Sequence, residues 1–344
     1  MATKFIIKEN ESIRDALVLL DNSTHDGQTL FVVDDNNKMI GTATDGDIRR
    51  GMIRGAVLTD SISTVMHTNF KFVRAGEDNT RKLKSSREEQ IFFIPELDDG
   101  GHLVRICNLL KYTNLLPVDA VLMAGGKGER LRPLTEKTPK PLLLVGDKAI
   151  IDHNIDRLIS YGVEHITVTI NYLGEQIEAH YAEEHNGVKI NCCREPKFLG
   201  TIGSIQYVEN FYNDTVLVMN SDLFTNIDYE DFYLHFHELD AEMSIAAVPY
   251  NVSIPYGILD LDGRNVKGLL EKPEYNYYVN AGIYLIKRRA LNEIPDNDFF
   301  NATDLIEKLI SENKKVIRYP LNGTWIDIGS PQEYQKANDL VKHL

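Results

Sequence analysis

Continuous apolar runs alternate with amphipathic segments through the last two thirds of the chain. Residues 118–124 and 215–220 read VDAVLMA and TVLVMN, the pattern of strands that are buried on both faces of a parallel sheet. Residues 150–160 instead place apolar side chains at helical spacing, and Gly162 follows as a helix stop. This alternation predicts a doubly wound α/β domain over residues 116–344, with ligands at the carboxyl ends of its strands.

The first third of the chain contains a shorter apolar pattern that occurs twice. Residues 31–48 align without gaps on residues 92–109, and both read as a strand, an acidic turn, a second strand and the start of a helix. A helix-like segment precedes each copy, beginning after Ser12 in the first and after Asn79 in the second. A repeated unit of about 60 residues predicts two copies that cover each other's apolar faces over residues 1–115.

The composition is that of a globular chain with an acidic excess. Its 344 residues suggest two domains, and 37 basic against 51 acidic residues give a net charge of −14. This balance argues against nucleic acid or an anionic membrane as the main partner, because both attract an excess of Lys and Arg. We find no signal-peptide pattern, no apolar run of membrane-spanning length and no disulfide framework in the sequence. A cytoplasmic protein that binds small ligands is therefore expected.

A glycine-rich segment directly after the first buried strand of the second domain carries several cations. It reads LMAGGKGERLRPLT over residues 122–135 and is followed by TPKPL over residues 138–142. Glycine lets backbone N–H groups approach phosphate oxygens closely, and Arg130 and Lys140 add positive charge against the acidic background. The spacing fits neither a P-loop nor the G-x-G-x-x-G dinucleotide fingerprint. We expect this segment to bind a phosphate-containing ligand.

Together with six later segments, this motif resembles the sugar-1-phosphate nucleotidylyltransferase family over residues 118–344. The later segments, in family order, are GTIGS at 200–204, NSD at 220–222, YG at 256–257, EKP at 271–273, NAG at 280–282 and WIDIG at 325–329. The resemblance implies a Rossmann-like, doubly wound fold of the GT-A-like kind. It also implies a reaction in which a sugar 1-phosphate oxygen attacks the α-phosphorus of a nucleoside triphosphate, and pyrophosphate leaves. Such catalysis depends on positioning and charge neutralisation, and it needs no general base because the attacking oxygen is already ionised.

The resemblance further implies roles for individual residues. Asp222 and Asp327 would hold Mg²⁺, a cation that suits two carboxylates together with phosphate oxygens. Arg130 would stabilise the triphosphate, Lys140 would lie near the reacting phosphates, and Lys272 would bind the phosphate of the sugar. The nucleotide site as a whole would comprise Leu122, Gly125, Gly126, Gly128, Arg130, Asn171, Glu195 and Gly200. The sugar-phosphate site would comprise Gly257, Glu271, Lys272 and Asn280.

The identity of the base and of the sugar stays open at this point. The same positions serve guanine, uracil or thymine in different relatives, so GTP, UTP and dTTP are all candidates. The arrangement of domains resembles that of guanylyltransferases for hexosamine or mannose-type sugar phosphates, which favours GTP and a GDP-sugar product. An alternative of a different class is a non-catalytic nucleotide sensor, and the intact set of charged residues argues against it.

The first third resembles a pair of CBS modules, the regulatory unit also called a Bateman module. Residues 41–47, GTATDGD, are similar to the G-x-x-T-x-x-D signature, which implies that Thr44 contacts a nucleotide phosphate and Asp47 the ribose hydroxyls. The gapless alignment puts Arg105 in place of Thr44 and Asn108 in place of Asp47, so we expect one intact and one altered nucleotide site. The resemblance also implies a homo-oligomer, and a pair that serves only in dimerisation is the alternative.

Overall fold

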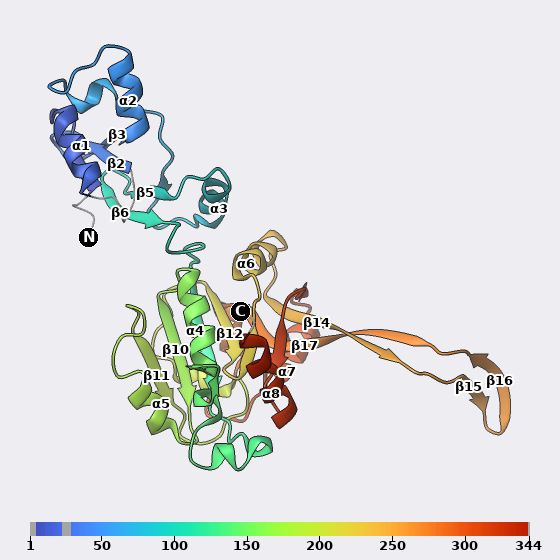
Figure 1. The fold of residues 1–344 in the computed structure, drawn as a ribbon. Helices are drawn as coiled ribbons and strands as arrows, with labels where there is room; N and C mark the ends of the chain where they lie inside the picture. Colours follow the sequence, from blue (N-terminus) through green and yellow to red (C-terminus); the bar gives the residue numbers. More distant parts are fainter. Residues whose placement is uncertain (1–4, 23–28, 343–344) are drawn as a thin grey trace. The chain divides into compact units, whose positions relative to one another are not determined.

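The computed structural model describes residues 5–22 and 29–342, and the chain divides into two compact units (Figure 1). The first unit is Met1–Leu115 and the second is Leu116–Leu344. Two three-stranded sheets lie in the first unit, and a seven-stranded sheet forms the centre of the second. Among the described residues, no helix is both long and apolar enough to cross a membrane.

The first unit contains the same strand arrangement twice. The strands are β1 (Ile6–Lys8), β2 (Thr29–Val33) and β3 (Met39–Thr44), then β4 (Val73–Arg74), β5 (Phe93–Leu97) and β6 (Leu103–Asn108). In each copy the first pair of strands is parallel and the second pair antiparallel. The helices are α1 (Ile13–Asp21) and α3 (Thr80–Glu88), which follow the first strand of each copy, and α2 (Asp45–Ile53), which follows β3. The internal repeat is therefore present as a duplicated fold.

The strand register corrects the alignment of the two copies. Val33 pairs with Met39 across one turn, and Leu97 pairs with Leu103 across a turn of the same length. Equivalent residues are thus 64 positions apart, from Val33 to Leu97, whereas the gapless sequence alignment used an offset of 61. An odd shift of three residues exchanges the two faces of every strand, so the sequence alignment matched core positions with surface positions.

Asn108, and not Arg105, therefore occupies the position of Thr44 in the second copy. Its side-chain oxygen accepts a hydrogen bond of 3.2 Å from the Lys111 N–H, as the Thr44 hydroxyl accepts one of 3.2 Å from the Asp47 N–H. Lys111 consequently stands where Asp47 stands. The second copy keeps a side-chain cap but replaces the predicted ribose-binding carboxylate with a cation.

The two copies pack against each other, as the repeat predicts. Phe31 and Met39 of the first copy form a buried cluster with Leu97 of the second. The Met39 N–H donates to the Gly101 carbonyl oxygen at 2.9 Å, so the two acidic turns are also joined through the backbone.

The central sheet of the second unit confirms the predicted α/β fold. Its strand order is β11-β10-β7-β12-β17-β14-β18, with β17 antiparallel to both of its neighbours. The strands are β7 (Val118–Ala124), β10 (His165–Ile170), β11 (Ile190–Arg194), β12 (Thr215–Asn220), β14 (Met243–Ser253), β17 (Glu274–Lys287) and β18 (Val316–Pro320). The helices are α4 (Ile150–Ser160), α5 (Gly174–His180), α6 (Tyr229–Glu238), α7 (Ala302–Ser311) and α8 (Pro331–Val341). Val121 of β7 and Val218 of β12 pack against Leu305 of α7 on one face of the sheet. Leu122, the next residue of β7, faces the opposite side and is equally buried, so both faces of the sheet are covered.

Two strands continue beyond this sheet as a long hairpin, which we call the arm (residues 248–279). β18 pairs with β14 only as far as Ala247, but the β14–β17 ladder continues to Ser253 and Glu274. Beyond it, β15 (Ile258–Asp262) and β16 (Asn265–Leu270) form the end of the arm, as Figure 1 shows.

Gly282, where β17 leaves the arm for the sheet, provides a test of this packing. Its φ is 72°, and an added Cβ would lie 2.5 Å from Nδ2 of Asn220. We expect Gly282→Ala to lower the free energy of unfolding by about 1–3 kcal/mol, because it combines backbone strain with overpacking. Urea unfolding followed by the fluorescence of Trp325, which donates to the Ala281 carbonyl oxygen at 2.9 Å, measures the effect. Gly268→Ala is the control, since its nearest neighbouring atom would be 3.7 Å away, and equal midpoints for both variants would contradict the prediction.

Candidate active site

A pocket of about 410 Å³ lies at the carboxyl ends of β7 and β12. Many of the residues singled out from the sequence line it, namely Gly125, Gly126, Gly128, Arg130, Lys140, Glu195, Gly200 and Asp222. This is the edge at which open α/β sheets bind ligands, because the loops that follow parallel strands meet there. Leu122 is not part of the lining and lies buried within β7.

The glycine-rich loop approaches its neighbours more closely than a side chain would allow. A Cβ on Gly125 would lie 2.5 Å from Oε1 of Glu195, and one on Gly128 would lie 3.0 Å from Cβ of Lys140. The Thr135 hydroxyl donates to the Gly128 carbonyl oxygen at 2.8 Å and holds the loop in place. A Cβ on Gly126 would meet nothing within 4 Å, so the backbone at that position is open to a ligand.

Two carboxylates from distant parts of the sequence meet beside this loop. β13 (Leu223–Thr225) pairs with β19 (Trp325–Asp327), and the Leu223–Asp327 register places Asp222 next to Asp327. Burial, followed by the charge of Asp222, raises the pKa of the Asp327 carboxyl.

One oxygen of this carboxylate pair has no partner. Oδ2 of Asp222 accepts a hydrogen bond from Lys140, but Oδ1 is buried without any hydrogen bond. A buried carboxylate oxygen without a partner is unfavourable unless a cation or a donor reaches it. No group of three or more His, Cys, Asp or Glu side chains within the described residues is arranged to hold a metal. Asp222 and Asp327 therefore suit a hard divalent cation that takes its other ligands from phosphate and water.

Arg130 and Lys140 supply positive charge on the same side of the pocket. The Lys140 side chain is buried against Asp222. The Arg130 guanidinium lies over Gly329, where an added Cβ would be 3.0 Å from it. The positive charges of Lys140 and Arg130 favour the ionised form of Asp327 and oppose the effect of burial on its pKa. The arrangement of two carboxylates facing two cations can hold a metal and a polyphosphate together.

Glu195 and Asn171 form a second polar group, next to Gly125 of the glycine-rich loop. Oε2 of Glu195 accepts a hydrogen bond of 3.1 Å from the Leu199 N–H, and the carboxylate also bonds the Asn171 side chain. Burial raises the pKa of the Glu195 carboxyl. Gly200 follows Leu199 and also lines the pocket. Its φ is 83°, and a Cβ there would lie 2.6 Å from the Phe300 carbonyl oxygen.

The predicted sugar-phosphate residues are divided between the core and the arm. Asn280 lies at the base of the arm and accepts a hydrogen bond of 2.9 Å from the Gly282 N–H. Gly257, Glu271 and Lys272 lie on the outer part of the arm, where a Cβ on Gly257 would be 3.0 Å from the Glu271 carboxylate. Residues 274–280 are a continuous strand, which at about 3.3 Å per residue separates Glu274, two residues after Lys272, from Asn280 by roughly 20 Å.

Two residues that contribute to the site were given no role in the sequence analysis. Phe198 lines it with 56% of its surface exposed, which suits a side chain that stacks on a planar group. Gly329 provides the space for the Arg130 guanidinium. The signal for each was available, since Phe198 directly precedes the LGT segment and Gly329 ends the WIDIG segment.

In the first unit, Thr44 and Asp47 satisfy each other in a capping box. The Thr44 hydroxyl donates to Oδ2 of Asp47 at 2.6 Å, and Arg50 donates to Oδ1 at 2.7 Å. A cavity of about 860 Å³ is lined by Thr44, Arg49, His67 and Lys71 among others, but not by Asp47. The carboxylate predicted to bind ribose is thus engaged within its own helix.

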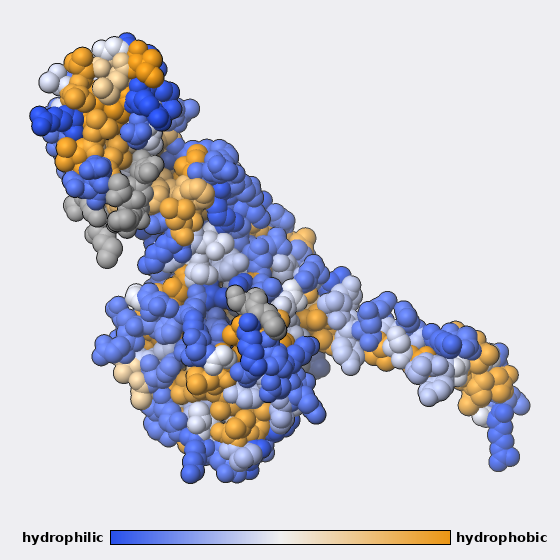
Figure 2. Space-filling view, viewed as in Figure 1, coloured by the Kyte–Doolittle hydropathy of each residue, from blue (hydrophilic) through white to orange (hydrophobic). Residues whose placement is uncertain are grey.

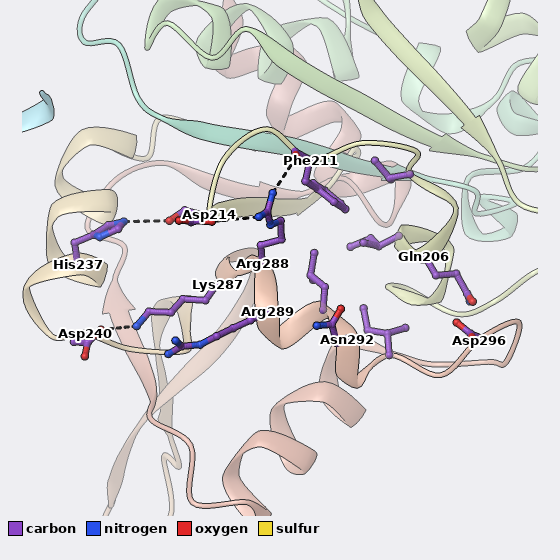
Figure 3. Close-up of a pocket in the computed structure, with 15 residues that line it drawn as sticks. Gln206, Phe211, Asp214, His237, Asp240, Lys287, Arg288, Arg289, Asn292 and Asp296 are labelled. Atoms are coloured by element: carbon purple, nitrogen blue, oxygen red, sulfur yellow. Dashed lines mark hydrogen bonds and ion pairs between the residues drawn. The ribbon is translucent and has the colours of Figure 1, made fainter. Parts of the chain in front are cut away.

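A larger hollow of about 930 Å³ opens at the opposite end of β12 (Figure 3). It is lined by Thr215, the first residue of β12, and by three consecutive cations at residues 287–289. Arg288 lies 3.5 Å from Asp214, Lys287 pairs with Asp240, and Arg289 pairs with Glu242. This hollow therefore lies away from the carboxyl-terminal edge at which open α/β sheets bind ligands.

Comparisons with known proteins agree with this geometry. The family model for nucleotidyl transferases matches residues 119–343, and the model for CBS domains matches residues 1–54. A putative mannose-1-phosphate guanyltransferase of Sulfolobus acidocaldarius is 30% identical over 225 residues, 64% of this chain and 62% of that protein. The bifunctional protein GlmU of Methanococcus maripaludis is 32% identical over 232 residues, 64% of this chain and 54% of that protein. The chain thus spans less than two thirds of the length of these relatives.

A solved structure shows a similar fold. HddC from Yersinia pseudotuberculosis superimposes with a TM-score of 0.51 and is 25% identical, covering 65% of this chain and 99% of HddC. The same protein has been solved in complex with GMP-PN, with 26% identity to this chain. With its family match over most of residues 116–344 and a CBS match ahead of it, the chain belongs to the nucleotidyl transferase family and carries an N-terminal CBS domain.

Proposed function

We propose that the protein transfers a nucleotidyl group from GTP to a sugar 1-phosphate and releases a GDP-sugar and pyrophosphate. The observation that carries the proposal is the meeting of Asp222, Asp327, Arg130 and Lys140 beside a glycine loop whose backbone is open to phosphate. Mg²⁺ bound by the two carboxylates would supply positive charge to phosphate oxygens of both substrates. Such a reaction consumes nucleoside triphosphates and is expected in the cytoplasm.

In this reaction, one bond at the α-phosphorus forms as another breaks. A phosphate oxygen of the sugar 1-phosphate bonds to the α-phosphorus, and the bond from the α-phosphorus to the bridging oxygen of pyrophosphate breaks in line with it. Arg130 neutralises the charge that develops on the phosphates, and Lys140 exchanges its contact with Asp222 for one with the substrates. The attacking oxygen carries no proton, so no base is required.

Glu195 favours guanine over the pyrimidine bases. The N1–H and the amino group of guanine are adjacent donors that a single carboxylate accepts together, whereas uracil and thymine present one N–H between two carbonyl oxygens. Oε1 of Glu195 faces Gly125 in the pocket, while Oε2 is held by the Leu199 N–H. The printed names of the relatives, which include mannose-1-phosphate guanyltransferase, support GTP and a hexose or hexosamine 1-phosphate.

We further propose that the first unit binds a regulatory nucleotide in its own cavity. Arg49 and Lys71, which pair with Asp45 and Glu89, line this cavity together with the rings of Phe70 and Phe92. A nucleotide phosphate would compete for the two cations, and its base would stack on the rings. A CBS pair that serves only in oligomerisation would bind no nucleotide there, so a binding measurement distinguishes the two alternatives.

Pyrophosphate release tests the reaction itself. Wild-type protein with Mg²⁺ should release pyrophosphate from GTP and at least one hexose or hexosamine 1-phosphate, and Asp222→Ala should lower the rate by on the order of a thousandfold. The measurement is a matrix of four nucleoside triphosphates against common sugar 1-phosphates. Asp214→Ala, which changes an almost fully exposed carboxylate, should leave the rate unchanged. Absence of pyrophosphate across the whole matrix would exclude the enzyme and favour a nucleotide sensor.

Substitution of Glu195 tests the choice of base. Glu195→Gln should lower kcat/KM for GTP by about 10–100-fold relative to kcat/KM for UTP, because one charged acceptor is lost. The matched control is Glu209→Gln, an exposed side chain outside the pocket. An equal loss for GTP and UTP would mean that Glu195 only supports the loop.

Nucleotide binding tests the role of the first unit. Calorimetric titration of the full chain with AMP, ADP and ATP should show binding that Arg49→Glu weakens by about tenfold or more. Arg54→Glu lies on the same segment but outside the cavity lining and serves as the control. If none of the three nucleotides binds, the cavity has no regulatory nucleotide of this class.

A further inference from the structure

Two exposed phenylalanine rings lie next to each other at the pocket formed by the carboxyl ends of β7 and β12. Phe198, which lines this pocket, is 56% exposed, and Phe299 is 51% exposed. Their ring centroids are 5.9 Å apart, and the angle between the ring planes is 58°. Exposed apolar side chains also occur at the end of the arm, as Figure 2 shows, but a pair of rings beside a pocket is placed to contact a ligand.

Backbone hydrogen bonds join the two segments that carry these rings. The Phe300 N–H donates to the Leu199 carbonyl oxygen at 2.9 Å. The Phe300 carbonyl oxygen accepts hydrogen bonds of 3.1 Å from the N–H groups of Ile202 and Gly203. The turn that precedes α7 is thereby held against residues 199–203.

The same contacts keep both rings at the surface. Leu199 is fully buried, and Phe300 packs against the core of the second unit. The residues directly before them, Phe198 and Phe299, are both more than half exposed. Rings that the backbone already holds in place lose little conformational freedom when a ligand binds, which favours affinity.

The neighbouring groups indicate which part of a nucleotide these rings contact. Glu195, the group that we assign to the base, lines the same pocket three residues before Phe198. The Leu199 N–H donates to Oε2 of Glu195 at 3.1 Å, which closes a turn that contains Phe198. Glu195 can accept hydrogen bonds only from the edge of a base, so its flat face is left for an aromatic ring.

We propose that Phe198 stacks on a purine base and that Phe299 holds the Phe198 ring in place, so that the pair favours purine over pyrimidine nucleotides. The proposal rests on the proposed function, because it places the base of the substrate beside Glu195. The two fused rings of a purine offer a larger π surface than uracil or thymine does, and stacking increases with that surface. Stacking depends on the face of the base and hydrogen bonding on its edge, so the two contributions can be measured separately.

Substitutions of Phe198 test the stacking. Phe198→Ala should raise KM for GTP about tenfold and KM for UTP less than about threefold, with kcat nearly unchanged, because stacking is the same in the ground state and the transition state. Phe198→Tyr keeps the ring and should keep the wild-type KM, whereas Phe198→Leu keeps only the apolar volume and should resemble Phe198→Ala. Ile310→Ala, which changes an exposed apolar side chain of α7 outside the pocket lining, is the control. An equal rise in KM for both nucleotides, or a wild-type KM in Phe198→Leu, overturns the stacking.

A double-mutant cycle tests Phe299 as a positioning residue. Phe299→Ala should raise KM for GTP about threefold and leave kcat unchanged, and Phe299→Tyr should restore the wild-type KM. Combined with Phe198→Ala, it should add nothing further, because Phe299 acts only through the Phe198 ring. A further threefold rise in the double variant overturns this role.

Fluorine NMR gives a second readout that does not depend on activity. The full chain with Phe198→4-fluorophenylalanine is titrated with GTP and Mg²⁺ without sugar phosphate. We expect a saturable shift of the fluorine resonance with GTP and none with inorganic triphosphate, because only the base brings a ring current to the label. Ile310→4-fluorophenylalanine is the control and should show no shift.

The outcome separates this proposal from the proposed function. Equal shifts with GTP and inorganic triphosphate, or no shift with GTP, overturn the stacking. If the same protein releases pyrophosphate from GTP and a sugar 1-phosphate, the proposed function stands without it. A shift with GTP alone supports the stacking even where no sugar 1-phosphate in the matrix is a substrate.

Discussion

The pairing of β13 with β19 is the contact on which the site depends. It joins residues about 100 positions apart in sequence and places Asp222 beside Asp327. The sequence of either strand alone does not indicate that the two carboxylates are neighbours. Phe224 of β13 and Ile326 of β19 pack in a buried cluster that also contains Leu131. Because Leu131 follows Arg130 directly, the same cluster fixes the cationic loop. One apolar cluster thereby sets the distance between the carboxylates and the cations.

The carboxylates of Asp222 and Asp327 come together at an energetic cost. One oxygen of Asp222 is buried without a partner, and burial together with the neighbouring charge raises the pKa of Asp327. Lys140 offsets only part of this cost, since it contacts a single oxygen of Asp222. A divalent cation bound by both carboxylates would offset the rest and would free Lys140 for phosphate.

The sequence allowed the central sheet and the phosphate pocket to be predicted, because their determinants are local. Buried parallel strands read as unbroken apolar runs. The glycines that let a phosphate approach the backbone come directly after such a strand. The register of the two CBS copies could not be obtained in the same way. A gapless match of apolar letters takes no account of turn length, and only the pairing of Leu97 with Leu103 fixes the position of Asn108. The arm could not be predicted either, since alternating residues such as Leu259 and Leu261 indicate a strand but not that it extends beyond the central sheet.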